Sequence, residues 1–175
     1  MSSIDFIKTE VAAAAARGVR QCVVLGSRSP SPDAFEGSPD QTLQVFAPER
    51  FASEALAAAL EKSDFDKLKA SLFVWIGGAG FRTVDAVIAG LAFIASLPKG
   101  SAVVFDYAVE RTSIESLAHT ALDALASRIS LPGSVKYLIQ PRALAALLRG
   151  LGFNQIVDLA QEEPLTGIRL VSAVV

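Results

Sequence analysis

Short apolar runs alternate with helical patterns along this chain. Four runs of strand length are "QCVVLG", "TLQVFA", "ASLFVWIGG" and "SAVVFDY". Helical spacing of apolar residues occurs between or before them, in "SSIDFIKTEVAAAAARG", "SEALAAALEK" and "TVDAVIAGLAFIASL". Unbroken apolar runs are typical of strands that are covered on both faces of a parallel sheet. The alternation therefore predicts an α/β fold, with a mostly parallel sheet and helices on both of its faces.

The helical segments also have predicted faces and ends. Leu56 and Leu60 lie on one side of the second helix, and the apolar face of the third consists of Val84, Val87, Ile88, Leu91 and Ile94. Gly18 is expected to end the first helix, and Pro141 suits the first position of a helix in "QPRALAALLRGLGF". A long helix is expected in "SIESLAHTALDALASRI". The last two strands, "QIVDL" and "IRLVSAVV", are expected to form an antiparallel pair.

Composition narrows the class of protein. The 175 residues predict one domain, residues 1–175, with a substantial core. A net charge of −2 without a cluster of Lys and Arg argues against nucleic acid or an anionic membrane as the partner. No uncharged apolar run reaches the roughly 18 residues that span a bilayer. The first residues show no signal core, so we expect a cytoplasmic protein. One cysteine and one histidine predict neither a disulfide nor a zinc site.

Ligands of parallel α/β sheets bind beyond the carboxyl ends of the strands. The residues predicted at those ends are Gly26 and Ser27, Glu49 and Arg50, Gly77 and Gly78, and Asp106 and Tyr107. A functional site, if the chain has one, is expected there. The sequence contains no catalytic triad, paired carboxylates or metal-ligand spacing that would identify catalytic residues.

Two glycine-containing loops each have two interpretations. Gly26, Ser27 and Arg28 form either a loop over a cofactor or anion, with Arg28 as the counter-charge, or a plain turn kept extended by the following prolines. The stretch "IGGAGFRT" is either an anion site at a helix start or a tight turn with Thr83 as the helix cap. The glycines lack the spacing of a P-loop or dinucleotide fingerprint.

The remaining polar candidates at the strand ends also have two interpretations each. Asp106 could orient a substrate and Tyr107 could stack on one, or Asp106 could cap a loop while Tyr107 packs against a helix. Glu49 and Arg50 could bind ligand groups or pair with neighbours on an exposed edge. Structural roles are expected for three further residues, His119, Cys22 and Trp75.

Four segments, from about Ala16 to about Asp158, resemble the leucine carboxyl methyltransferase-like family of S-adenosylmethionine-dependent O-methyltransferases. The matching text is "ARGVRQCVVLG", "FAPERF…LAAALEKSDFDKLKASLFVWIGG", "VIAGLAFIASLPKGSAVVFDY" and "QPRALAALLRGLGF". The resemblance implies a Rossmann-like class I methyltransferase fold with S-adenosylmethionine over the ends of the first strands. It places cofactor contacts at Gly26, Ser27, Glu49, Arg50, Gly77 and Gly78, and the substrate side at Asp106 and Tyr107.

The chain departs from that family at the cofactor. About twenty residues separate Gly26 from the "FAPERF" strand, too few for the family's acid-ended strand with a helix on either side. The fold is therefore expected to be shortened by about one strand–helix unit. Ser27 and Arg28 stand where the family has a glycine-rich loop, and Arg50 stands where it has an aspartate. Gly77 and Gly78 follow a strand after which the family often has an acid.

Two functions are consistent with these observations. The first is an S-adenosylmethionine-dependent O-methyltransferase that acts on a small carboxylate or hydroxyl substrate. The second is a non-catalytic protein with the methyltransferase fold that serves as a binding or self-assembling module. The second hypothesis rests on the apolar surface that a missing strand would expose, and it predicts a homo-oligomer.

Overall fold

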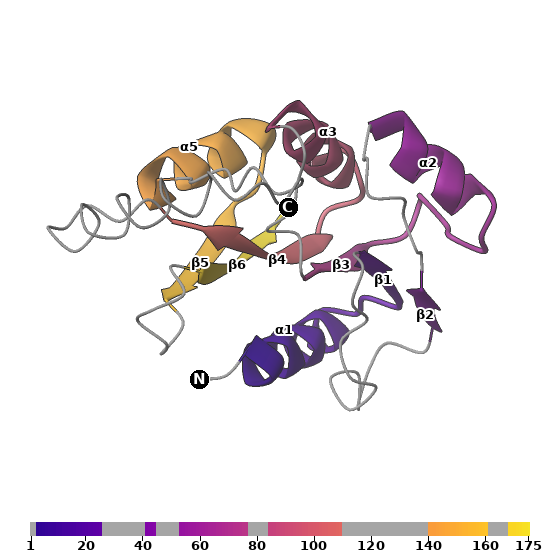
Figure 1. The fold of residues 1–175 in the computed structure, drawn as a ribbon. Helices are drawn as coiled ribbons and strands as arrows, with labels where there is room; N and C mark the ends of the chain where they lie inside the picture. The colour runs from indigo at the N-terminus through magenta and orange to yellow at the C-terminus, as the bar shows by residue number, and fades with distance from the viewer. Residues whose placement is uncertain (1–2, 26–40, 45–52, 77–83, 110–139, 161–167) are drawn as a thin grey trace, which may run out of the picture.

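The computed structural model describes residues 3–25, 41–44, 53–76, 84–109, 140–160 and 168–175. These residues form one twisted sheet with helices on both faces (Figure 1). The strands are β1 (Gln21–Leu25), β2 (Gln41–Gln44), β3 (Ser71–Trp75), β4 (Ala102–Ala108), β5 (Gln155–Ala160) and β6 (Ile168–Val174). The helices are α1 (Ser3–Ala16), α2 (Ser53–Glu61), α3 (Val84–Ala95) and α5 (Pro141–Leu151).

The sheet is parallel over four strands and antiparallel at one end. Its six strands follow the order β2-β1-β3-β4-β6-β5. Strands β2, β1, β3 and β4 pair in parallel, whereas β6 is antiparallel to both of its neighbours. The predicted α/β class, the mostly parallel sheet and the closing antiparallel pair are therefore confirmed.

The two faces of the sheet have separate apolar cores. Helix α1 covers one face, where its residues Phe6 and Val11 pack with Leu72 of β3. Helices α2, α3 and α5 cover the other face (Figure 1). The buried side chains on that face include Leu56, Leu60, Leu91, Leu144 and Leu148 from the helices and Phe73, Trp75 and Phe105 from the strands. Alternate side chains of β3 and β4 thus enter opposite cores, which is why both runs are apolar without interruption.

The predicted helix boundaries are close to the observed ones. Gly18 has a φ of 85°, in the left-handed region that favours glycine, and Val19 N–H donates to the carbonyl of Ala14. Pro141 is the first residue of α5, and Gly152, with a φ of 109°, ends that helix. Leu56, Leu60, Val87, Leu91 and Ile94 are buried as expected, and Ile88 is half-buried. The helix predicted in "SIESLAHTALDALASRI", including His119, lies outside the described residues.

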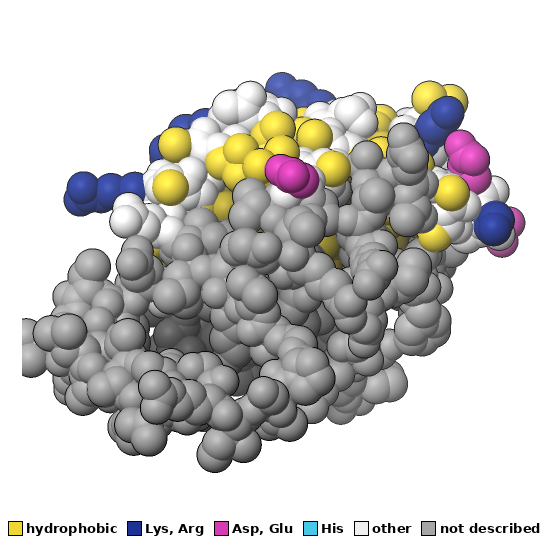
Figure 2. Space-filling model, turned by 45° about the horizontal axis from the view of Figure 1, so that its top comes forward, with side chains coloured by type: hydrophobic (Ala, Val, Ile, Leu, Met, Phe, Trp, Pro, Cys, Tyr) yellow, Lys and Arg dark blue, Asp and Glu magenta, His cyan; other side chains and the backbone are white. Residues whose placement is uncertain are grey.

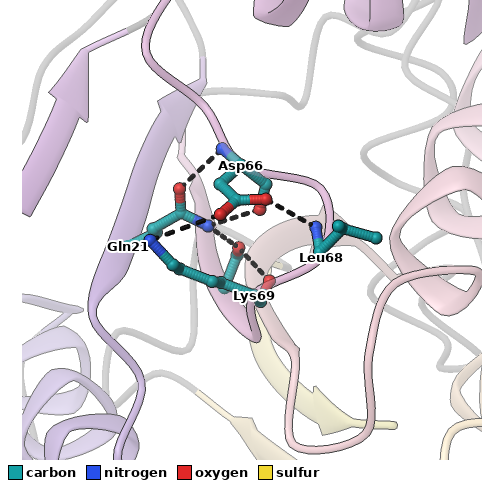
Figure 3. A network of polar contacts seen from close by, with 5 residues as sticks. Gln21, Asp66, Leu68 and Lys69 are labelled. Carbon is teal, nitrogen blue, oxygen red and sulfur yellow. Dashed lines mark hydrogen bonds and ion pairs between the residues drawn. The ribbon is translucent and has the colours of Figure 1, made fainter.

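A polar network fixes the amino ends of β1 and β3 (Figure 3). Gln21, the buried first residue of β1, donates from Nε2 to the carbonyl oxygen of Asp66 at 2.8 Å and to Oγ of Ser71 at 3.0 Å. Its Oε1 accepts the N–H of Asp66 at 2.8 Å. The Asp66 carboxylate in turn accepts the N–H of Leu68 and pairs with Lys69. This edge is closed by internal hydrogen bonds, so a ligand site is expected at the opposite edge.

Candidate functional site

The carboxyl ends of the parallel strands meet at one edge of the sheet, as predicted. From β1 the chain continues to β2 on one side, whereas from β3 it continues to β4 on the other. The strand order therefore reverses between β1 and β3, and this reversal is the position at which open α/β sheets bind ligands. Leu25 and Trp75, which end these two strands, are both buried in the core on the α3 face.

The predicted cofactor residues follow these strands. Gly26 and Ser27 come directly after Leu25, and Gly77 and Gly78 come after Ile76. Glu49 and Arg50 follow β2. All six lie outside the described residues, so their contribution to a site stays a prediction. Strand β2 is hydrogen-bonded directly to β1 and reads Gln-Thr-Leu-Gln, without an acidic residue.

The two predicted substrate residues point to opposite faces of the sheet. Tyr107 belongs to the core on the α3 face, together with Phe105, whereas Asp106 lies between them in sequence and faces the α1 side. Both residues are buried, and Asp106 pairs in register with Leu170 of β6. The strand end therefore presents one of these side chains on each face rather than both to a single surface.

Tyr107 belongs to a polar cluster that joins three strands. Its hydroxyl donates to Oδ2 of Asp158 on β5 at 2.6 Å, and Nε of Arg169 on β6 donates to Oδ1 of the same carboxylate at 2.8 Å. Tyr107 and Arg169 are register partners, so the cluster lies at the carboxyl end of β4. The Asp158 side chain is 22 % exposed and that of Arg169 is 29 % exposed, whereas Tyr107 is buried.

Burial and hydrogen bonding raise the pKa of Tyr107, and hydrogen bonding raises the pKa of Arg169. Burial raises the pKa of the Tyr107 hydroxyl well above its ordinary value of 10.0, and the hydrogen bond to Asp158 raises it further. The hydrogen bond to Asp158 also raises the pKa of Arg169. Near neutral pH the cluster therefore consists of a neutral phenol and a permanent cation, both donating to one carboxylate.

Asp158 and Arg169 were not among the sequence candidates. Each is a charged residue inside an apolar strand pattern, "QIVDL" and "IRLVSAVV", and such a residue needs a partner when its strand is covered. That signal marks both residues as paired or functional. It does not identify the partner, because the partner depends on how the two strands enter the sheet.

Other chemistry is limited in the part of the chain that the structure describes. Burial raises the pKa of the Cys22 thiol to about 12, which makes it the inert core residue that was expected. Trp75 is buried, also as expected. The described ranges contain no group of three His, Cys, Asp or Glu side chains that could hold a metal ion. No helix among the described residues has the length and hydropathy needed to cross a membrane.

Comparison with known proteins gives structural but not sequence relatives. No protein-family model and no curated protein sequence matches the chain. A proposed methyltransferase from Thermobifida fusca superposes with a TM-score of 0.65 at 15% identity, over 98% of this chain and 77% of that one. A DUF574 family protein from Streptomyces avermitilis gives a TM-score of 0.61 at 16% identity, over 97% of this chain and 81% of that one.

A third solved structure contains a bound cofactor product. It is the magnesium protoporphyrin IX methyltransferase of Synechocystis with bound SAH, S-adenosylhomocysteine. It matches with a TM-score of 0.56 at 14% identity, over 98% of this chain and 82% of that one. At these identities the likeness establishes the fold alone. The chain therefore has the Rossmann-like fold of the S-adenosylmethionine-dependent methyltransferases.

Proposed function

We propose that this protein is an S-adenosylmethionine-dependent O-methyltransferase that acts on a small carboxylate or hydroxyl compound. The observation that carries the proposal is the reversal of strand order between β1 and β3, where sheets of this kind bind nucleotide-like ligands. The finer resemblance to the leucine carboxyl methyltransferase-like family, which rests on the segments quoted above, is part of the same proposal.

Glycine residues follow β1 and β3, although Ser27 and Arg28 depart from the glycine-rich loop of the family that the chain resembles. Gly26 and Gly77 lack a Cβ, so the backbone could approach a ligand closely. The side chains of Leu25 and Trp75, which end these two strands, are packed in the core on the α3 face. The cofactor would supply an electrophilic methyl group. The chain would then contribute chiefly alignment of the acceptor oxygen, which needs no triad or metal.

Isothermal titration calorimetry with S-adenosylmethionine and S-adenosylhomocysteine tests this proposal. We expect both ligands to bind, and Gly26→Trp to abolish binding by filling the space beside β1. Gly150→Ala is the matched control, because nothing lies within 4 Å of a Cβ at that exposed position in α5. The control should bind as the wild type does. Absence of heat at millimolar ligand would rule out the proposal.

A non-catalytic, self-assembling protein is the second candidate function. Val157 on β5, at the edge of the described sheet, is 47 % exposed. Figure 2 shows hydrophobic side chains in the middle of the described helical face, beside an acidic side chain, with Lys and Arg farther out. Apolar surface on an edge strand favours pairing between copies. Light scattering should then show a dimer that Val157→Lys dissociates, and a strictly monomeric wild type would contradict this candidate.

A further inference from the structure

The cluster of Tyr107, Asp158 and Arg169 lies on the same edge of the sheet as the proposed cofactor position. Strand β6 runs antiparallel to β4, so its beginning, with Arg169, lies beside the carboxyl end of β4. Two strand spacings separate β3 from β6. At about 4.8 Å per spacing, Arg169 stands about 10 Å along the sheet from β3, which borders the proposed site. One small substrate could therefore reach both.

Among the described residues, Asp158 and Tyr107 engage only part of the Arg169 guanidinium. It has five N–H donors: the hydrogen bond from Nε to Oδ1 of Asp158 uses one, and the Tyr107 hydroxyl is a second hydrogen-bond partner. The terminal edge, with Nη1 and Nη2, has the spacing that matches two oxygens of a carboxylate. The side chain is 29 % exposed, so it is accessible from solvent.

Asp158 holds this guanidinium in a defined orientation. Its second oxygen is fixed by the Tyr107 hydroxyl at 2.6 Å, and Tyr107 is itself buried among the core side chains. The carboxylate also offsets part of the positive charge of Arg169. Recognition at Arg169 would therefore depend on the geometry of its donor pair more than on net charge. Asp158 and Tyr107 are positioning residues in this arrangement.

We propose that Arg169 binds a carboxylate of the substrate, and that the methyl-accepting oxygen lies at the opposite end of that substrate, over β3. This inference rests on the proposed function and names its substrate class: an elongated compound with a carboxylate at one end and a hydroxyl several bonds away. The separation of β3 from β6 excludes the bound carboxylate as the methyl acceptor. A hydroxycinnamate has the required chemistry.

Calorimetric titration with 4-hydroxycinnamate and with its neutral amide tests the inference without the cofactor. The wild type should bind the acid and discriminate against the amide. Arg169→Gln should weaken acid binding about 10- to 100-fold, the range for loss of a charge-assisted pair. Arg169→Lys should lose nearly as much, because it keeps the charge but not the paired donors. Arg149→Gln removes an exposed arginine of α5 and should change nothing.

The outcomes separate this inference from the proposed function. If S-adenosylhomocysteine binds but the wild type does not bind the acid, or binds acid and amide equally, the inference is wrong and the methyltransferase proposal stands. If the acid binds through Arg169 and S-adenosylhomocysteine does not bind, the carboxylate site stands and the methyltransferase proposal fails. If both Arg169 variants prefer the acid over the amide as strongly as the wild type does, the inference is wrong. Thermal unfolding of each variant verifies that it is folded.

Discussion

The indole ring of Trp75 occupies the space where a side chain at Gly90 would begin. A Cβ at Gly90 would lie 3.1 Å from Cη2 and 3.2 Å from Cζ3 of the ring, closer than ordinary van der Waals contact. Trp75 ends β3 and is 2 % exposed, and Gly90 lies inside α3. Glycine within a helix is about 1 kcal/mol less favourable than alanine. Here it allows α3 to pack closely against the sheet beneath the proposed cofactor site.

Substitution of Gly90 should therefore lower stability. We expect Gly90→Val to reduce the free energy of unfolding by about 1–3 kcal/mol, because the ring is enclosed by core side chains and has little room to move. The control is Gly150→Ala, which meets no atom within 4 Å and should raise stability by about 0.5–1 kcal/mol. Urea unfolding measures both. Equal stability of Gly90→Val and wild type would mean that the indole can shift.

Among the polar residues at the amino edge of the sheet, Gln21 should cause the largest loss of stability when it is replaced. Gln21→Ala removes the acceptor of the Asp66 N–H and two donated hydrogen bonds from a buried site. We expect a loss of about 1–3 kcal/mol, because buried groups are left without partners. Gln155→Ala removes the same side chain from the exposed start of β5 and should change stability by no more than about 0.5 kcal/mol. Urea unfolding of the two variants gives the comparison, and equal losses would contradict it.

The contact between α1 and β6 provides a second test of buried polar pairing. Oγ of Ser172, a buried residue of β6, donates to Oε2 of Glu10 on α1 at 2.6 Å. Hydrogen bonds to charged groups contribute about 1.5–3 kcal/mol, so Ser172→Ala should lower the free energy of unfolding by a similar amount. Ser96→Ala is the matched change, because that hydroxyl makes its bond at an exposed helix end. Thermal unfolding should show a clearly lower Tm for Ser172→Ala only.

The raised pKa of Tyr107 predicts a loss of stability in alkali. A group with a pKa raised by folding stabilises the native state fully below its unfolded pKa, here 10.0, and loses that contribution as the pH rises further. Tyr107→Phe should be less stable than the wild type at pH 8, and the difference should shrink above about pH 10. The Cys22 thiol, with its pKa raised to about 12, affects both proteins alike and cancels from the comparison. A difference independent of pH would contradict the assignment.

The elements and the site differ in how far the sequence could predict them. Strands such as "ASLFVWIGG" were predictable because burial on both faces produces a continuous apolar run. Tyr107 was identified at its strand end, but its partners were not. Asp158 is 51 residues away along the chain, and it meets Tyr107 only because β6 enters between β4 and β5. The close approach of Gly90 to Trp75 likewise depends on tertiary packing that helical periodicity does not contain.

The position of β6 has a consequence for how the protein folds. This strand is the last of the six to be synthesised, yet it is the neighbour through which β5 joins the sheet. A nascent chain that ends before residue 168 could pair β1, β3 and β4 with one another. Strand β5 would still have no neighbouring strand to pair with, because its neighbour in the described sheet is β6. The pairing of β6 with β4 joins parts of the chain that lie far apart in sequence, and non-local pairing of this kind slows folding. Until that pairing forms, β4 has an unpaired edge on which a chaperone could act.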